Sequence, residues 1–206
     1  MLNLGILASG RGSNLQAIID AIETSQLQAQ VSVVISDRTD ALALERAEKH
    51  GVATEVILRE DYPDKQSFEE ALYKCLVAHK VELVVLAGYM RLVSGWFLDR
   101  FKWRVINIHP SLLPSFPGLN AQRQALEYGV RVSGCTVHFV DEGMDSGPII
   151  LQRTVPVFDD DTEETLSTRI LEQEHIAYPQ AIQLYAQGSL NIEGRRVRIL
   201  EDQDSH

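Results

Sequence analysis

The feature that most constrains the fold is an alternation of short apolar runs with amphipathic segments through the first half of the chain. Four runs have the length and β-branched content of buried strands. Strands that alternate with helices pair in parallel, because each crossover returns the chain to the same edge of the sheet. The sequence therefore predicts an α/β fold with a doubly wound, mostly parallel sheet. The strands are expected at residues 2–8, 31–36, 54–58 and 82–87, and the helices at 15–24, 41–50 and 65–80.

A fifth apolar run, residues 105–108, carries two polar residues at its end. Asn107 and His109 are two positions apart, so on a strand both side chains point to the same face. Pro110 must end the strand at His109, because proline cannot donate a hydrogen bond to the ladder. In an open α/β sheet, ligands bind at the carboxyl ends of strands. The pair is therefore a candidate site, and the alternative is a strand-end histidine with a satisfied partner and an asparagine that caps the turn.

After Gly118 the regular alternation of strands and helices ends. The sequence shows no repeat, low-complexity segment or linker. Asp161 and Glu164 form a candidate capping box for a long helix that starts at Thr162, and Pro179 must kink or break that helix. We expect one domain, with a nucleotide- or phosphate-binding half at 1–103, a half that completes the site at 104–188, and a terminal hairpin and tail at 189–206. The other expected elements are a helix at 120–128, strands at 133–140 and 149–157, a hairpin at 190–200 and a frayed tail at 201–206.

Composition excludes several classes of partner. The 206 residues include 19 Lys and Arg against 29 Asp and Glu, a net charge of −10 that argues against nucleic acid and anionic membranes. The sequence lacks a basic signal-peptide start and an apolar run near the ~20 residues of a membrane-spanning helix. Cys75 and Cys135 are far apart and read as core residues in a reducing compartment. A cytoplasmic protein that binds small molecules is expected.

A glycine-rich loop between the first strand and the first helix is a candidate anion site. Gly10 and Gly12 would let a ligand approach backbone N–H groups at the helix N-terminus. The Walker pattern is absent, and Leu15 stands where the dinucleotide fingerprint requires glycine. A single phosphate therefore fits better than a pyrophosphate, with Ser13 and Asn14 adding a hydroxyl and an amide. The alternative is a glycine turn in which Ser13 or Asn14 caps the helix.

The acidic, glycine-rich segment 141–148 joins two expected strands. It is either a solvated hairpin loop or the segment that brings the carboxylate of Asp145 to Asn107 and His109. A carboxylate beside an imidazole favours the imidazolium form. An amide donor, a histidine acid and an orienting carboxylate suit acyl transfer, because they can stabilise an oxyanion and move a proton.

The histidines lack metal-ligand spacing, so no metal site is expected. Residues 88–93, after the fourth strand, form either the wall of an apolar ligand site or ordinary packing.

Four segments together carry a resemblance to a known family. They are S-G-R-G-S-N-L-Q at 9–16, L-A-G-Y-M-R at 86–91, N-I-H-P-S-L-L-P-S-F-P-G at 107–118 and V-H-F-V-D-E-G-M-D-S-G-P at 137–148. The chain resembles the phosphoribosylglycinamide formyltransferases, a branch of the folate-dependent formyltransferases, from the first strand to about Gly188. The resemblance implies the three-layer α/β/α formyltransferase fold. It also implies formyl transfer from 10-formyltetrahydrofolate to the amine of N1-(5-phospho-D-ribosyl)glycinamide in purine biosynthesis, without a metal.

The resemblance implies a role for each matching residue. Asn107, His109 and Asp145 would be catalytic. The ribonucleotide and its phosphate would be bound by Gly12, Ser13, Asn14 and Glu174. The folate would be bound by Lys65, Met90, Arg91, Leu92, Val93, Asn107, Val140 and Asp141. Two positions depart from the common family pattern, since relatives commonly carry arginine near Lys65 and often carry histidine at the place of Gln122.

Two alternatives remain at this point. The chain could be another enzyme of the same chemistry, either a methionyl-tRNA formyltransferase or a formyltetrahydrofolate hydrolase. The negative net charge and the absence of an appended RNA-binding domain speak against the first, and the absence of an additional N-terminal regulatory domain speaks against the second. The chain could also be a non-catalytic nucleotide-binding module, which would explain the glycine-rich loop but not the other polar residues. A monomer or a homodimer is expected.

Overall fold

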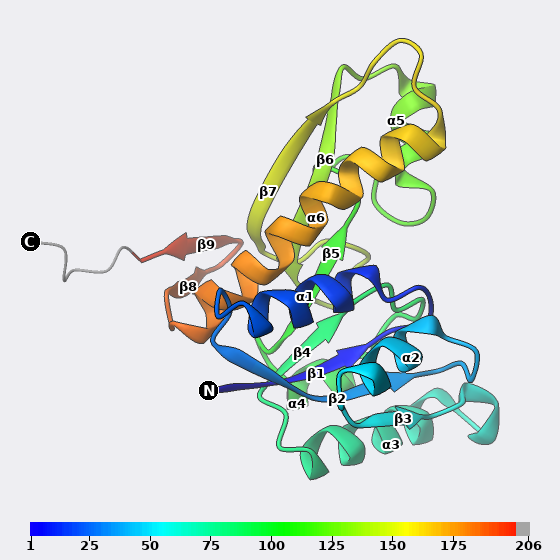
Figure 1. Cartoon of the computed structure of the whole chain (residues 1–206), viewed down its shortest axis with the longest axis vertical. Helices are drawn as coiled ribbons and strands as arrows, with labels where there is room; N and C mark the ends of the chain where they lie inside the picture. The colour runs from blue at the N-terminus through cyan, green and yellow to red at the C-terminus, as the bar shows by residue number, and fades with distance from the viewer. Residues whose placement is uncertain (201–206) are drawn as a thin grey trace, which may run out of the picture. The chain divides into compact units, whose positions relative to one another are not determined.

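The computed structural model describes residues 1–200, and the expected tail at 201–206 lies outside the described residues. The chain divides into two compact parts, Met1–Asn107 and the residues from Ile108 onward. The elements up to the boundary are labelled in Figure 1. They are β1 (Leu2–Leu7), α1 (Ser13–Glu23), β2 (Ala29–Ser36), α2 (Leu42–Lys49), β3 (Thr54–Val56), the 3-10 turn η1 (Arg59–Asp61), α3 (Lys65–Ala78), β4 (Leu83–Leu86), α4 (Gly95–Arg100) and β5 (Val105–His109).

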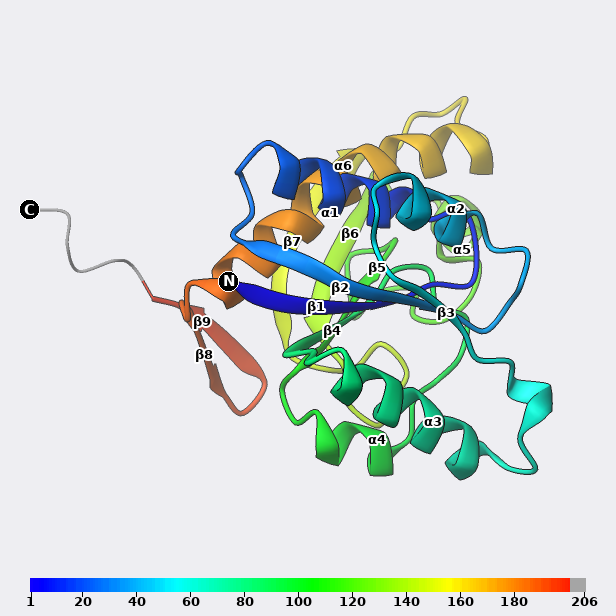
Figure 2. The same cartoon turned by 60° about the horizontal axis from the view of Figure 1, so that its bottom comes forward.

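The first part is a parallel sheet covered by helices on both faces. Its strands lie in the order β3-β2-β1-β4-β5, and every neighbouring pair is parallel. Figure 2 shows α1 and α2 on one face of this sheet and α3 and α4 on the other. The inner strands are largely buried apolar runs because helices cover both faces, whereas the edge strand β3 is partly exposed. The predicted doubly wound, mostly parallel α/β sheet is confirmed.

The strand register brings the carboxyl ends of four strands to one edge. Leu7 of β1 pairs with Ile35 of β2 and with Leu86 of β4. Leu86 in turn pairs with Asn107 of β5. The loops that follow β1, β2 and β4 therefore leave the sheet at the level of Asn107. This edge is where ligands bind in open α/β sheets.

One helix of the first part was not anticipated from the sequence. Helix α4 has six residues, too few to show a helical period. Its first turn is capped by Ser94, whose hydroxyl accepts the backbone N–H of Phe97 at 3.4 Å. Phe97 and Phe101 are buried beneath it and explain why this short helix forms. The expected strands and helices are present, with bounds that differ by one or two residues at most ends.

In the second part, a long helix packs on an antiparallel pair of strands. Helix α6 contacts β6 and β7 along its length and also contacts α5 (Figure 1). Strand β7 pairs in parallel with β9, which forms the predicted hairpin with β8. The elements are α5 (Ala121–Tyr128), β6 (Val132–Phe139), β7 (Ile149–Pro156), α6 (Glu163–Ala186), β8 (Leu190–Glu193) and β9 (Arg196–Ile199).

The start of α6 differs from the prediction. The capping box consists of Thr162 and Thr165, which exchange backbone-to-side-chain hydrogen bonds of 2.9 and 3.2 Å, so the predicted pair Asp161 and Glu164 is wrong. Asp161 instead accepts two hydrogen bonds from the guanidinium of Arg169, each 2.8 Å long. These bonds hold the pKa of Asp161 well below its usual range.

The sequence predicts that Pro179 kinks or breaks α6. The helix continues through Pro179 from Glu163 to Ala186, so it does not break there. Proline removes one helical hydrogen bond and crowds the carbonyl four residues earlier. Several residues on the inner face around it are fully buried, among them Tyr178 and Ile182. Their burial offsets the lost bond, since a buried side chain of this size contributes about 1.5–3 kcal/mol.

Candidate active site

His109 and Asp145 form the chemical centre of the second part. His109 ends strand β5, and Asp145 lies in the loop between β6 and β7. The Nδ1 atom of His109 is 3.3 Å from Oδ2 of Asp145, and only 6% and 14% of the two side chains are exposed. The same carboxylate oxygen accepts the backbone N–H of Gly118 at 2.8 Å. The structure thus brings together two of the three predicted catalytic residues, and Asn107 lies on the same strand as His109.

The second ring nitrogen of His109 also faces an acceptor. Nε2 lies 2.8 Å from the backbone carbonyl of Phe116. That carbonyl is held in place by the loop after β5, where the buried hydroxyl of Ser111 donates to the carbonyl oxygens of Ser115 and Phe116. A neutral imidazole has one N–H, whereas an imidazolium has two. Two acceptors at opposite ends of the ring therefore suit the protonated form of His109.

A second histidine, His138, lies beside Asp145 and is not among the predicted site residues. Nε2 of His138 lies 3.7 Å from Oδ1 of Asp145, and Nδ1 lies 2.9 Å from the backbone carbonyl of Phe139. Burial lowers the pKa of His138. The nearby carboxylate of Asp145 raises this pKa, but its effect is smaller than that of burial. His138 is therefore neutral, and we treat the 3.7 Å approach as a contact between polar groups rather than an ion pair.

A signal for His138 was present in the alternation of strand β6. The sequence alternates Cys135, Val137 and Phe139 with Thr136 and His138, and in the structure both sets are buried. Thr136 donates to the carbonyl of Ser111, which lies in the loop that also holds His109. A polar residue two positions after Thr136 therefore faces the same loop.

The glycine-rich loop has the geometry of an anion site without a competing side-chain cap. Within the described residues, α1 has Gly12 at its N-cap and no side-chain capping hydrogen bond, so the alternative with Ser13 or Asn14 as the cap is not observed. The first intrahelical bond runs from Gln16 to Gly12, and the amides of the first turn precede it. Arg46 donates to the carbonyl of Arg11 at 2.9 Å and adds positive charge beside the loop.

The segment after β4 presents apolar side chains at the surface. Met90 and Leu92 are 73% and 61% exposed, whereas Val93 is buried. Two neighbouring exposed apolar residues can cover the flat face of a ligand. Lys65 is the first residue of α3, and its Nζ atom is 3.8 Å from the buried carboxylate of Glu69.

The remaining predicted site residues lie in the second part. Val140 and Asp141 follow β6, and Asp141 accepts from the backbone of Gly143 and from the hydroxyl of Ser146, which fixes the turn. Glu174 lies on α6 and is buried. Gln122 lies in the first turn of α5 and is half-buried.

The cysteines are free and unsuited to nucleophilic chemistry. Burial raises the pKa of Cys75 to about 11, with a smaller contribution from Glu55. Burial, with a smaller contribution from Glu174, raises the pKa of Cys135 to about 12. The thiolate is the reactive form, so neither side chain is activated at neutral pH.

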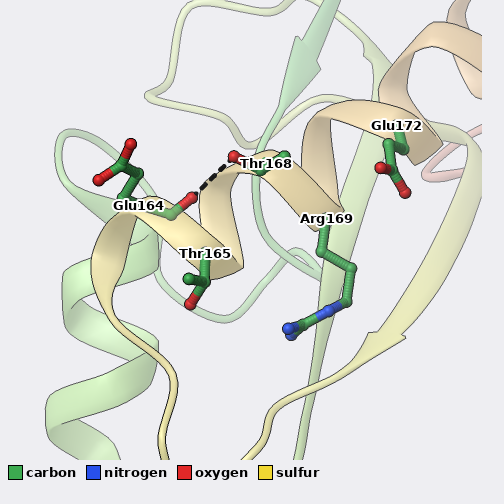
Figure 3. Close-up of a pocket in the computed structure, with 5 residues that line it drawn as sticks. All are labelled: Glu164, Thr165, Thr168, Arg169 and Glu172. Carbon is green, nitrogen blue, oxygen red and sulfur yellow. Dashed lines mark hydrogen bonds between the residues drawn. The ribbon is translucent and has the colours of Figure 1, made fainter.

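A surface depression on α6 is lined by residues other than those predicted for the site. Figure 3 shows a depression on the first half of α6, where Thr168 donates to the carbonyl of Glu164 at 2.9 Å. None of the residues predicted for the site lines it.

Among residues 1–200, no group of three potential metal ligands is found. The described helices include none that is both long and apolar enough to cross a membrane.

Comparison with known proteins identifies the class. The sequence profile of the formyl transferase family matches residues 2–182. The chain therefore belongs to the formyl transferase family, as the resemblance implies. It is 43% identical to phosphoribosylglycinamide formyltransferase of Escherichia coli over 191 residues, which cover 93% of this chain and 90% of that protein.

A solved structure and a longer relative extend the comparison. Glycinamide ribonucleotide transformylase 1 from Symbiobacterium toebii is 57% identical and superposes with a TM-score of 0.96, covering 98% of this chain and 95% of that one. The expected fold is confirmed by this likeness. The trifunctional purine biosynthetic protein adenosine-3 of Drosophila pseudoobscura pseudoobscura is 49% identical over 91% of this chain. The chain spans only 14% of the length of that relative.

Proposed function

We propose that this chain transfers the formyl group of 10-formyltetrahydrofolate to the amine of N1-(5-phospho-D-ribosyl)glycinamide. The observation that carries the proposal is the buried pair of His109 and Asp145, whose carboxylate is anchored by the backbone of Gly118. A buried imidazole between two acceptors is equipped to donate hydrogen bonds and protons to a reacting acyl group. The names of the relatives in E. coli and S. toebii support the choice of substrates.

The proposed chemistry is a direct transfer. A bond forms between the substrate amine and the formyl carbon, the bond from that carbon to the folate nitrogen breaks, and a proton passes from the amine to that nitrogen. The Asn107 amide and the His109 imidazolium donate hydrogen bonds to the oxyanion that develops on the formyl oxygen. Each such donor supplies roughly 10²–10³ in rate. No covalent bond to the protein is needed.

Asp145 acts on His109 rather than on the reacting atoms. Its carboxylate orients the ring through Nδ1. The contact of 3.3 Å is longer than the 2.7–2.9 Å typical of a charge-assisted bond. Nε2 has the shorter contact, with the carbonyl of Phe116. His109 must therefore exchange one of these two contacts in order to donate to the substrate.

The proposed binding assignments are those that the family resemblance implies. The amides of the first turn of α1, together with Ser13 and Asn14, receive the phosphate, and Glu174 binds the remainder of the ribonucleotide. The exposed Met90 and Leu92, together with Arg91 and Val93, receive the folate ring system. Lys65, Val140 and Asp141 complete the folate contacts. The co-substrate supplies a formyl group already activated for transfer to an amine.

The assay that tests the proposal has three arms. The protein is mixed with 10-formyltetrahydrofolate alone, with glycinamide ribonucleotide added, or with the dephosphorylated nucleoside added, and folate absorbance is followed. We expect turnover that depends on the ribonucleotide. Release of formate without ribonucleotide would instead indicate a hydrolase, and no change of absorbance in any arm would indicate a binding module.

A further inference from the structure

A buried carboxylate outside the predicted site holds the segment after β4. Asp37 follows β2, and only 5% of its side chain is exposed. Its Oδ1 atom accepts the hydroxyl of Ser9 at 2.7 Å, and its Oδ2 atom accepts Nε of Arg91 at 2.5 Å. The Ser9 hydroxyl in turn accepts the backbone N–H of Met90 at 3.1 Å. Asp37 therefore reaches Met90 through one hydroxyl and Arg91 directly.

The loops after β1 and β4 are also joined through the backbone. The N–H of Ser9 donates to the carbonyl of Gly88 at 3.1 Å. Ser9 is buried, so this junction is shielded from water. The guanidinium of Arg91 lies 5.9 Å from the centre of the Phe68 ring, so its polar head is held between Asp37 and that ring. The neighbouring Met90 and Leu92 are exposed.

A second buried carboxylate holds the other end of the segment. Glu69 of α3 is buried and accepts the backbone N–H of Ser94 at 2.8 Å as well as the Ser94 hydroxyl. Residues 90–94 are thus fixed at one end by Asp37 and at the other by Glu69. Because neither carboxylate belongs to the segment itself, its conformation depends on both.

We propose that Asp37 is a positioning residue for the formyl donor, which fixes the backbone of Met90 and the side chain of Arg91 in the conformation that binds the folate ring system. This inference rests on the proposed function, which assigns residues 90–93 to the donor. Asp37 touches neither reacting group. Its contribution is preorganisation, because a segment already held in its bound conformation loses less freedom when the ligand binds.

The two hydrogen bonds that Asp37 accepts can be tested separately. Asp37→Asn keeps an oxygen for the Ser9 hydroxyl but places an amide N–H against Arg91, and Asp37→Ala removes both acceptors. Ser9→Ala removes the acceptor of the Met90 amide without a change of charge. Asp40→Asn is the matched control, since Asp40 lies in the same turn and forms only an exposed pair with Arg38.

The experiment compares how each substitution changes the affinity for the two ligands. Dissociation constants for tetrahydrofolate and for glycinamide ribonucleotide are obtained by calorimetry, and KM for the donor is measured beside kcat. Asp37→Ala should weaken tetrahydrofolate binding by about tenfold, the change expected when a hydrogen bond to a charged group is lost. Ribonucleotide affinity and kcat at saturating donor should stay at the wild-type level. Asp37→Asn and Ser9→Ala should each give part of the loss, and Asp40→Asn none.

The failures of the two proposals can be told apart. If the wild-type protein neither binds tetrahydrofolate nor transfers formyl, the proposed function is rejected. If the wild-type protein is active and folded Asp37→Ala binds tetrahydrofolate as tightly as the wild type does, the positioning role is rejected. Equal weakening of both ligands would indicate general destabilisation and would also overturn it. Should Asp37→Ala fail to fold, Ser9→Ala decides by the same criteria.

Discussion

Nδ1 of His109 and Oδ2 of Asp145 lie 3.3 Å apart in a nearly solvent-free setting, and the second carboxylate oxygen approaches the neutral His138. The aspartate is fixed independently of either histidine, because its Oδ2 atom also accepts the backbone N–H of Gly118. Gly118 has a positive φ of 79°, which an L side chain rarely adopts. The carboxylate can therefore keep its position while His109 changes its hydrogen bonds.

Asp145→Asn should lower kcat by at least about 100-fold, because an amide does not orient the ring of His109 as the carboxylate does. His109→Ala should cause a loss of similar size. Steady-state rates with both substrates saturating measure the effect. Glu142→Gln, which removes an exposed charge from the same loop, is the control and should retain the wild-type rate. Near-normal turnover in Asp145→Asn would remove the carboxylate from the mechanism.

Asn107→Ala should reduce kcat and kcat/KM together by about 10²–10³, the contribution of one oxyanion donor. The reason is that the amide is proposed to meet the formyl oxygen only once negative charge develops on it. Full kinetic curves for both substrates separate this role from ground-state binding. A rise in KM with unchanged kcat would assign Asn107 to uniform binding instead.

Substrate affinity should fall as pH drops below about 6, where the phosphate dianion gains its second proton. The helix N-terminus attracts a dianion more strongly than a monoanion. Calorimetric titration of the ribonucleotide at several pH values, with the dephosphorylated nucleoside as the control, measures this dependence. Equal affinity for both compounds would mean that the loop of Gly10 to Asn14 is only a turn.

Gly12→Ala should destabilise the fold by about 1–2 kcal/mol or more, because Gly12 has φ +69° and a left-handed conformation costs an alanine about that much. A Cβ there would also lie 2.7 Å from the Cα atom of Ala43. Gly10→Ala is the matched control, since its Cβ meets no atom within 4 Å, and it should shift stability by less than about 0.5 kcal/mol. Urea unfolding compares the two variants.

The free energy of unfolding should decrease as pH falls through the ordinary pKa of histidine, near 6.5. Below that pH the unfolded chain binds a proton at His138, whereas burial keeps His138 unprotonated in the folded chain. The direction of this change follows from the lowered pKa of His138 in the folded state. The contribution of neutral His138 to stability is fully present above pH 6.5. His138→Gln should flatten the dependence of the unfolding free energy on pH between 7 and 5. An unchanged slope would show that other groups control it.

The sequence predicts the parallel half of the fold well, because strands buried on both faces are continuous apolar runs that need no knowledge of their partners. It also places Asn107 and His109 at a strand end, since Pro110 must stop the ladder. Helix α4 escapes prediction because six residues are too few for a period. The continuity of α6 through Pro179 escapes it because burial on one face overrides a local rule.

The polar contacts are the part that the sequence could not provide. Asp37 and Arg91 are 54 positions apart, and nothing in the local sequence pairs them. Asp161 looks like part of a capping box but binds Arg169, because a bidentate guanidinium is a stronger partner than one backbone amide. His138 is visible only after strand alternation is combined with the position of Thr136.

The attachment of the donor segment at both ends has a consequence for its dynamics. The amides of Met90 and Ser94 are bonded to side chains, Ser9 and Glu69, and not to a neighbouring strand. Breaking these two bonds exposes both amides to solvent without separating any strands of the sheet. Hydrogen exchange at Met90 and Ser94 should therefore proceed through a local opening that requires less free energy than global unfolding. These two amides thus report on the local opening of residues 90–94 while the sheet stays protected.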